Sequence, residues 1–336
     1  MTTVFVSHPK DRLDHYFGER ALQALRAIAE VRLNPHERDL GLDELVAYAQ
    51  DCDALIAYRQ TPAPSVLFAR LPQLAAFLRC AVDIRTVDVD AASRHGVLVT
   101  HASAGYVPAV CEWVLAAMVD LARGISRYAA GYWKGEAPVP HMGAQLHGAT
   151  IGIIGFGRIG AELGEIARTL GMHVLVTDPQ PVKWRPGLSQ VPLGALLAKS
   201  DFVVCLAPAN KETENLMDAR AFEGMKPGAF FINASRGELV NEDALLAALD
   251  SGRLAGCALD VGRAPDQMPS PALATHPRVI ATPHIGGLTR PAIEHQALET
   301  VHQLEVLLGG GMPTGAVNGM HATRVRQWAR NGKATQ

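Results

Sequence analysis

Residues 149–160 read Ala149-Thr150-Ile151-Gly152-Ile153-Ile154-Gly155-Phe156-Gly157-Arg158-Ile159-Gly160. A short apolar strand runs here into a glycine turn and then into a helix rich in Ala, Leu and Glu. Gly155 permits the tight turn, Gly157 lets the backbone approach a phosphate group, and Gly160 lets the helix pack closely on its strand. Because the free N–H groups at the start of a helix attract anions, this stretch predicts a phosphate-binding turn.

The residues after this turn make the prediction more specific. A second strand over 173–177 follows the helix and ends at Asp178. A GxGxxG turn alone is a weak signal, but the order strand, turn, helix, strand and acid predicts a dinucleotide site. A carboxylate at that position binds the ribose hydroxyls and repels a 2′-phosphate, which favours NAD over NADP. Lys183 and Arg185 lie a few residues further on and could weaken this preference.

Composition narrows the class of protein. The 336 residues are too many for one ordinary core, so two domains are expected. A net charge of −2 gives no reason to expect nucleic acid or a membrane as partner. The five scattered cysteines form no C-x-x-C pair and suit reduced thiols, and no metal site is expected. Because neither a signal peptide nor a membrane-spanning run is visible, we expect a cytoplasmic protein.

Short strands alternate with helices through most of the chain, which predicts parallel sheets covered by helices. The strands are expected at 3–7, 54–57, 77–82 and 97–100, and after Asp178 at 202–206, 229–233, 256–261 and 279–282. A long apolar helix is expected over 109–128, followed by a loop over 131–148. A last helix over 291–308 is long enough to return to the first domain, which would then be discontinuous.

The end of the chain is basic. From His321 to Gln336 it carries Arg324, Arg326, Arg330 and Lys333 and no acid. We expect residues 317–336 to form a solvated, frayed tail.

Two polar clusters follow predicted strands beyond the glycine turn. Arg236 follows a strand and has small neighbours, so its guanidinium could face a cleft and bind a carboxylate through two hydrogen bonds. His284 stands between a proline and two glycines, and an imidazole titrates near neutral pH. A surface arginine and a structural histidine are the plainer alternatives. Beside a nicotinamide, Arg236 would hold a substrate carboxylate while His284 exchanges a proton with the hydroxyl.

With these features the sequence resembles the D-isomer-specific 2-hydroxyacid dehydrogenases, a family that includes phosphoglycerate and glyoxylate/hydroxypyruvate enzymes. The resemblance runs from about Ala54 to Leu308. It is carried by the glycine turn at 155–160, by an arginine signature over 225–237 and by a histidine signature over 283–287. The family implies an α/β fold with a Rossmann dinucleotide-binding domain over 104–287. It also implies a smaller, discontinuous, flavodoxin-like substrate domain over 1–103 and 288–316.

The resemblance also implies roles for single residues. Arg236 would be the catalytic, substrate-binding arginine and His284 the acid/base. The long helix with Cys111 looks like the family's dimer-forming segment, so a homodimer is expected. The residues expected to bind NAD, beside Gly155, Gly157 and Gly160 of the turn, are Arg158, Ile159, Asp178, Ala207, Pro208, Ala234, Asp260 and Gly287.

The chain departs from the family where a glutamate normally partners the histidine. That glutamate stands shortly after the strand that ends here at Asp260-Val261, and this chain has Pro265 at the expected place. Asp266 is adjacent and is the candidate third catalytic residue. If nothing substitutes for the glutamate, His284 should titrate lower and the pH optimum of reduction should move down.

A second departure concerns substrate binding. Where the family has a glycine-rich loop that holds the substrate carboxylate, this chain has Ala81 and Asp83. An acid there repels a carboxylate unless Arg85 or Arg59 neutralises it. Either the loop is built around an Asp83–Arg85 pair, or the substrate is not a common short hydroxy acid. The candidate substrate-binding residues are Arg59, Asp83, Arg85 and Tyr106.

The leading hypothesis is an NAD-dependent oxidoreductase that interconverts a D-2-hydroxy acid and its 2-keto acid. Formate or phosphonate oxidation on the same scaffold is a close variant. A dinucleotide-sensing, corepressor-like binding protein is the alternative from another class. The altered Asp83 loop and the missing glutamate favour that alternative, whereas the presence of both Arg236 and His284 argues against it.

Overall fold

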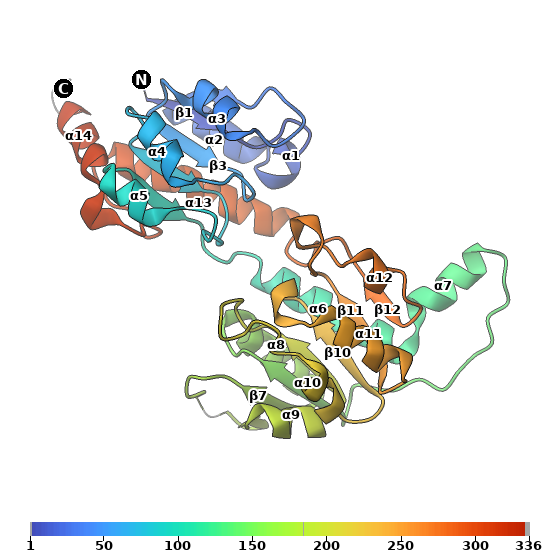
Figure 1. The fold of residues 1–336 in the computed structure, drawn as a ribbon. Helices are drawn as coiled ribbons and strands as arrows, with labels where there is room; N and C mark the ends of the chain where they lie inside the picture. The colour runs from blue at the N-terminus through green and yellow to red at the C-terminus, as the bar shows by residue number, and fades with distance from the viewer. Residues whose placement is uncertain (1, 184, 333–336) are drawn as a thin grey trace. The chain divides into compact units, whose positions relative to one another are not determined.

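The computed structural model describes residues 2–183 and 185–332. The chain forms two compact units, whose elements are labelled in Figure 1. Unit 1 holds the residues up to Tyr106 and those from Thr289 onward, and unit 2 holds Val107–Leu288.

Unit 1 is built on a five-stranded parallel sheet in the order β2-β1-β3-β4-β5. This is the strand order of flavodoxin-like folds. The strands are β1 (Thr3–Val6), β2 (Glu30–Leu33), β3 (Ala54–Ala57), β4 (Ala76–Arg79) and β5 (Leu98–His101).

Helices cover both faces of this sheet because side chains along a strand alternate between them. The helices of unit 1 are α1 (Leu13–Tyr16), α2 (Glu19–Ile28), α3 (Leu42–Ala49), α4 (Ser65–Arg70), α5 (Val89–Arg94), α13 (Arg290–Leu308) and α14 (Thr323–Gly332). Val4 and Val6 face a core shared with α2, α13 and α14, whereas Phe5 faces a second core shared with α3, α4 and α5.

The last helix corrects the expectation of a solvated tail. Ala322 and Val325 are buried in the core beside α2 and α13, and Trp328 packs against it. The guanidinium of Arg324 donates to the carbonyl oxygens of Leu71 and Leu74, at 2.9 and 2.8 Å. The basic segment is therefore a structural part of unit 1 as far as Trp328, and the backbone of α14 continues to Gly332. Lys333 and Gln336 lie outside the described residues.

A buried histidine follows β1. His8 is 1% exposed, and its ring lies between Phe17 and Tyr58 with centroid distances of 5.2 and 5.1 Å. Burial disfavours the charged form and lowers the pKa of His8 to about 3, from 6.5. Between these values the unfolded chain binds a proton that the folded chain does not. His8 therefore stabilises the fold above pH 6.5, and this contribution is lost as the pH falls toward 3.

We expect His8→Leu to flatten the pH dependence of the free energy of unfolding between pH 4 and 6. The wild-type slope should exceed that of the variant by up to about 1.4 kcal/mol per pH unit, the value for one proton. Urea unfolding at a series of pH values measures both slopes. His15→Leu, which replaces an exposed histidine of α1, should retain the wild-type slope. Equal slopes in the wild type and His8→Leu would contradict the assignment.

Unit 2 is built on a seven-stranded parallel sheet in the order β12-β11-β10-β9-β6-β7-β8. Renumbered from β6, this is the doubly wound Rossmann order, and the order in which strands are added to the sheet reverses between β6 and β9. The predicted fold class is confirmed. The strands are β6 (Thr150–Ile154), β7 (His173–Thr177), β8 (Leu188–Gln190), β9 (Phe202–Cys205), β10 (Ala229–Asn233), β11 (Leu254–Leu259) and β12 (Val279–Ala281).

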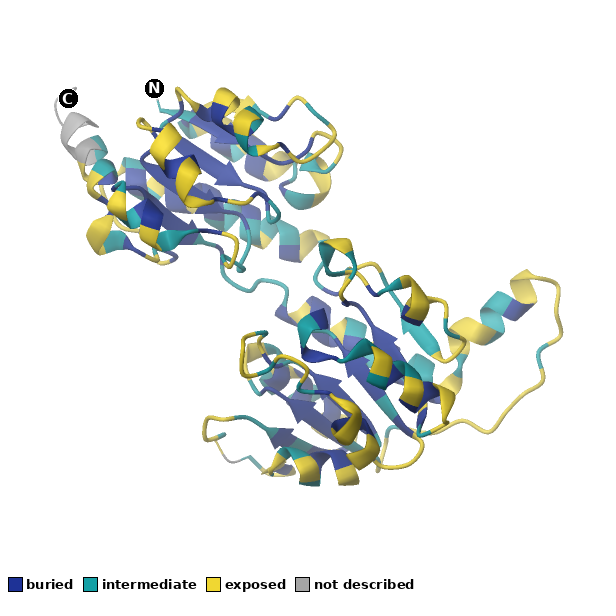
Figure 2. Cartoon of the chain, viewed as in Figure 1, coloured by how far each residue is buried: buried dark blue, intermediate teal, exposed yellow. Residues whose placement is uncertain are grey.

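The predicted helix over 109–128 is two helices. Gly124 adopts the left-handed conformation, with φ of 65°, and separates α6 (Val107–Arg123) from α7 (Ile125–Trp133). Residues of α6 such as Cys111 and Val114 are buried, whereas α7 and the segment after it are largely exposed (Figure 2). The other helices of unit 2 are α8 (Arg158–Thr169), α9 (Leu193–Lys199), α10 (Ala219–Gly224), α11 (Glu242–Asp250) and α12 (Pro271–Ala274). Over the described ranges, no helix has the length and apolar character needed to cross a membrane.

Candidate active site

The glycine turn lies between β6 and α8, where the strand order of unit 2 reverses. Gly155 has φ of 90°, and a Cβ there would lie 2.6 Å from the Cα of Ala207. A Cβ on Gly160 would collide with the carbonyl oxygen of Gly155, so the helix packs directly on the turn. A Cβ on Gly157, in contrast, would meet nothing within 4 Å. The turn is thus packed on two sides and open at Gly157.

Asp178 lies directly after β7, against this turn. Its carboxylate accepts hydrogen bonds from the main-chain N–H of Phe156 at 2.7 Å and of Gln180 at 2.9 Å. The nearby basic side chain of Arg185 instead forms an ion pair with Glu165, at 2.6 Å. The side chain held at the turn is therefore the carboxylate of Asp178. A carboxylate at this place favours ribose hydroxyls over a 2′-phosphate.

The other predicted dinucleotide residues follow strands of the same parallel sheet and so lie at its carboxyl edge. Arg158 and Ile159 form the first turn of α8, where main-chain N–H groups are open to an anion. The rest come after the ends of β9, β10, β11 and β12, and they are Ala207, Pro208, Ala234, Asp260 and Gly287.

Arg236 is held by the buried side chain of Asn233, the last residue of β10. The amide nitrogen of Asn233 donates to the carbonyl oxygen of Arg236 at 2.9 Å, and its amide oxygen accepts from the N–H of Ser235 at 3.0 Å. Arg236 is half-buried, and its guanidinium donates to the carbonyl oxygen of Ser235 at 2.7 Å. The loop after β10 therefore has a fixed shape that sets the position of the arginine.

His284 stands in a strained turn after β12, with φ of 56°. Asp260, buried after β11, stabilises this turn through both carboxylate oxygens. One oxygen accepts from the hydroxyl of Thr282 at 2.6 Å and from the N–H of Ile285 at 2.8 Å, and the other from the N–H of Gly286 at 2.7 Å. Asp260 thus shapes the histidine turn, a role that the sequence did not indicate.

The Nδ1 atom of His284 lies 3.0 Å from the main-chain carbonyl oxygen of Asp266. A carbonyl oxygen only accepts hydrogen bonds, so Nδ1 must carry the proton of this contact. Asp266 lies in the short helical turn η2 (Pro265–Gln267) and is left-handed, with φ of 58°. The predicted third residue is therefore beside the histidine, and its main-chain carbonyl oxygen contacts Nδ1.

The four candidate substrate residues lie in unit 1. Asp83 and Arg85 form an ion pair at 2.8 Å. This agrees with the first alternative given above, a loop built around an Asp83–Arg85 pair. The guanidinium of Arg59 lies 5.3 Å from the ring centroid of Tyr16, a cation–π distance. Tyr106 is half-buried and is the last residue of the first segment of unit 1.

Arg79 supports the loops that carry these residues, and sequence reasoning missed it. Its fully buried guanidinium donates to the carbonyl oxygens of Tyr58 and Thr61 and to the hydroxyl of Thr86. Burial lowers the pKa of Arg79 to about 10. The arginine joins the segment around Arg59 to the segment after Asp83. An arginine that ends the otherwise apolar strand Ala76–Arg79 was the available signal.

A family model for the NAD-binding domain of D-isomer specific 2-hydroxyacid dehydrogenases matches residues 113–286. The chain belongs to this family. The predicted resemblance is thereby confirmed, and the cofactor is NAD. The turn open at Gly157, the N-terminus of α8 and the carboxylate of Asp178 form a cradle that fits this dinucleotide.

Two family members and one solved structure are similar over most of the chain. Glyoxylate reductase of Thermococcus gammatolerans is 32% identical over 92% of the chain and 96% of its own length. Chloroplastic D-3-phosphoglycerate dehydrogenase 3 of Arabidopsis thaliana is 33% identical over 90% of the chain, which spans about half, 52%, of that protein. A crystal structure of a protein from Thermus thermophilus has a TM-score of 0.84 and 30% identity, and the match covers 94% of this chain and 100% of that one.

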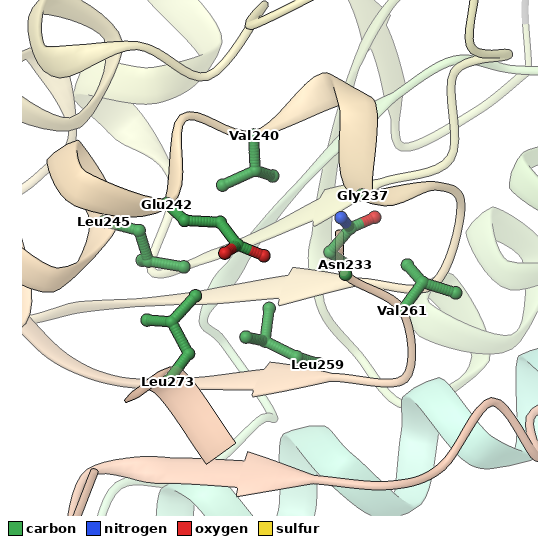
Figure 3. A pocket seen from close by; sticks show the side chains of 9 residues that line it. Asn233, Gly237, Val240, Glu242, Leu245, Leu259, Val261 and Leu273 are labelled. Carbon is green, nitrogen blue, oxygen red and sulfur yellow. The ribbon is translucent and has the colours of Figure 1, made fainter. Parts of the chain in front are cut away.

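Residues 234–237, which carry Arg236 after β10, are called the arginine loop below. A small pocket in unit 2 is lined by Asn233 and Gly237 at the two ends of this loop (Figure 3). Apolar side chains such as Leu245, Leu259 and Leu273 line it, together with the carboxylate of Glu242. Its volume of about 10 Å³ is close to the space for one water molecule. We therefore regard it as a packing gap and not as a ligand site. Among the described residues, no cluster of His, Cys, Asp and Glu could hold a metal ion.

In this family member, Gly157→Ala and Gly155→Ala should have different effects. Gly157→Ala places a methyl group on the open side of the turn, so the melting temperature should stay near the wild-type value. The Kd for NADH should rise about tenfold or more, a loss of about 1.4 kcal/mol. Gly155→Ala should lower the melting temperature because φ is 90° and main-chain atoms crowd the position. Thermal unfolding and NADH fluorescence titration measure both effects. Wild-type NADH affinity in Gly157→Ala would exclude Gly157 from the cradle.

Proposed function

We propose that the chain is an NAD-dependent dehydrogenase that interconverts a D-2-hydroxy acid and its 2-keto acid. One observation carries the proposal. Arg236 and His284 follow two strands of one parallel sheet, at the same carboxyl edge as the NAD turn. A carboxylate binder and a proton donor at the edge where NAD binds are what this reaction requires.

Arg236 would bind the substrate carboxylate with its planar fork and polarise the adjacent C2 carbonyl. His284 would donate a proton from Nε2 to the carbonyl oxygen during reduction and accept it during oxidation. NAD, when bound, supplies or accepts the hydride at C2. The proton on Nδ1, directed at the Asp266 carbonyl, leaves Nε2 as the nitrogen that exchanges the substrate proton.

We propose that unit 1 is the substrate-binding domain. Arg59, Arg85, Asp83 and Tyr106 are its candidate contacts with a small carboxylate. The Asp83–Arg85 pair supports this role, because it neutralises the acid that replaces the family's glycine.

We further propose a homodimer that forms through unit 2. Tyr132 and Trp133 at the end of α7 are 67% and 84% exposed, and Met142 in the following segment is fully exposed. Large apolar side chains gathered on one exposed segment are typical of an association surface. Light scattering should give twice the mass of the chain, and a monomer at micromolar concentration would contradict the dimer. The five buried, free cysteines support a reducing compartment such as the cytoplasm.

The test of the function is consumption of NADH, followed at 340 nm against a panel of 2-keto acids. We expect turnover with at least one member of the panel and loss of turnover in Arg236→Ala. NADH binding without turnover across a broad panel would contradict the enzyme assignment.

A further inference from the structure

The loop over residues 262–268, which we call the brace, lies directly on the arginine loop. A Cβ on Gly237 would collide with main-chain atoms of Gly262, and a Cβ on Gly262 would lie 2.5 Å from the Cα of Pro269. Only glycine allows the two backbones to approach this closely. The brace is therefore in main-chain contact with the segment that follows Arg236.

Arg263 fixes one end of the brace. Its guanidinium donates to the side chains of Glu214 and Asn215, at 2.9 and 2.8 Å, and to the carbonyl oxygen of Glu238 at 2.9 Å. The main-chain N–H of Arg263 donates to Glu242 at 3.1 Å. These bonds tie the beginning of the brace to the segment before α10 and to the segment over 238–242 that follows Arg236.

Gln267 fixes the other end. Its side-chain amide donates to Glu238 Oε1 at 3.2 Å, and its main-chain carbonyl oxygen accepts from the N–H of Gly262 at 2.7 Å. The N–H of Ala264 donates across the loop to the carbonyl oxygen of Met268 at 3.0 Å. Asp266 and Gln267 both have positive φ, 58° and 60°, which is costly for residues other than glycine. The bonds across the loop hold this pair in a conformation that turns the Asp266 carbonyl toward His284.

We propose that Gln267 is a positioning residue that, through Glu238, holds the Asp266 main-chain carbonyl on Nδ1 of His284. The carbonyl oxygen is the hydrogen-bond acceptor for Nδ1 of His284. It therefore selects the imidazole tautomer that carries hydrogen on Nδ1. Unlike a carboxylate, it is neutral and adds no negative charge that would favour the imidazolium form. The inference deepens the proposed function and rests on it for its catalytic consequence, but the tautomer can be measured without turnover.

The test is ¹⁵N NMR of the histidine side chains in the full chain, with His284 assigned by comparison with His284→Gln. We expect the Nδ1–H tautomer at His284 in the wild type. Gln267→Met keeps an unbranched side chain at positive φ but removes the amide donor, so the Nε2–H form should appear. Asp266→Asn changes only the side chain and should keep the wild-type tautomer. Gln23→Met, on the exposed face of α2, is the matched control and should keep it as well.

Kinetics give a second readout. In Gln267→Met we expect kcat for 2-keto acid reduction to fall about tenfold, with little change in KM and a shifted pH profile. An unchanged His284 tautomer in a folded Gln267→Met variant would overturn the proposal, and so would a tautomer change in Asp266→Asn alone. Absence of turnover in the wild type with the tautomer as expected would contradict the proposed function and leave the positioning role in place.

Discussion

His284→Gln should lower kcat/KM for 2-keto acid reduction by about 10²–10⁴-fold, the usual contribution of a general acid. Glutamine keeps a polar side chain of similar length but cannot deliver a proton. The affinity for NADH should change little, because the variant leaves the glycine turn and Asp178 intact. Steady-state kinetics and NADH titration separate the two effects.

The pH profile identifies the role of the histidine more closely than the rate alone. In the wild type, the rate of reduction should fall as the pH rises through the pKa of the acid, and this limb should be absent in His284→Gln. His302→Gln, which replaces an exposed histidine of α13, serves as the control and should retain the wild-type rate and limb. A His284→Gln variant that keeps both would show that the proton comes from another group.

Arg236→Ala should lower kcat/KM by about 10²–10³-fold, the cost of removing a group that stabilises charge in the transition state. KM should rise as well, because in the proposed mechanism the guanidinium also binds the ground-state carboxylate. Arg236→Lys keeps the charge but not the planar fork, so it should recover only part of the loss. Substrate kinetics at saturating NADH measure both variants.

Arg26→Ala is the matched control for this change, since Arg26 is an exposed arginine of α2. It should behave as the wild type. If Arg236→Ala had the same kinetics as this control, Arg236 would be a loop residue without a part in substrate binding.

The features predicted well from the sequence are those that local chemistry determines. The order of β6, glycine turn, α8 and β7 followed from apolar runs and glycine spacing. The helix expected over 291–308 is α13. Each of these signals lies within a few residues of the structure it produces.

The features that were missed depend on contacts between distant segments. The short strand β2 (Glu30–Leu33) carries two charged residues and gains its structure by pairing with β1. The basic end of the chain folds as α14 because Ala322 and Val325 are buried against the core formed by α2 and α13. The charge composition of this segment favoured a solvated tail. It carries no information about a core that distant helices form.

The same limit applies to the candidate site. The sequence placed Arg236 and His284 at strand ends, and the structure has them there. The sequence pointed to Asp266 as the acid beside His284, and Nδ1 of His284 contacts the main-chain carbonyl oxygen of Asp266. Every residue type has that oxygen, so no side-chain pattern indicates it. Two consecutive residues with positive φ create the contact, and their conformation depends on Glu238 and Gly262.

Transfer of deuterium from NADH that carries deuterium at both C4 positions of the nicotinamide tests the central claim most directly. The enzyme is incubated with labelled NADH and the best 2-keto acid of the panel, and the product is analysed by mass spectrometry and chiral chromatography. We predict one deuterium at C2 of a D-2-hydroxy acid, formed by the wild type and not by His284→Gln on the same time scale. A chain that binds NADH but forms no labelled hydroxy acid with any member of the panel would contradict the account.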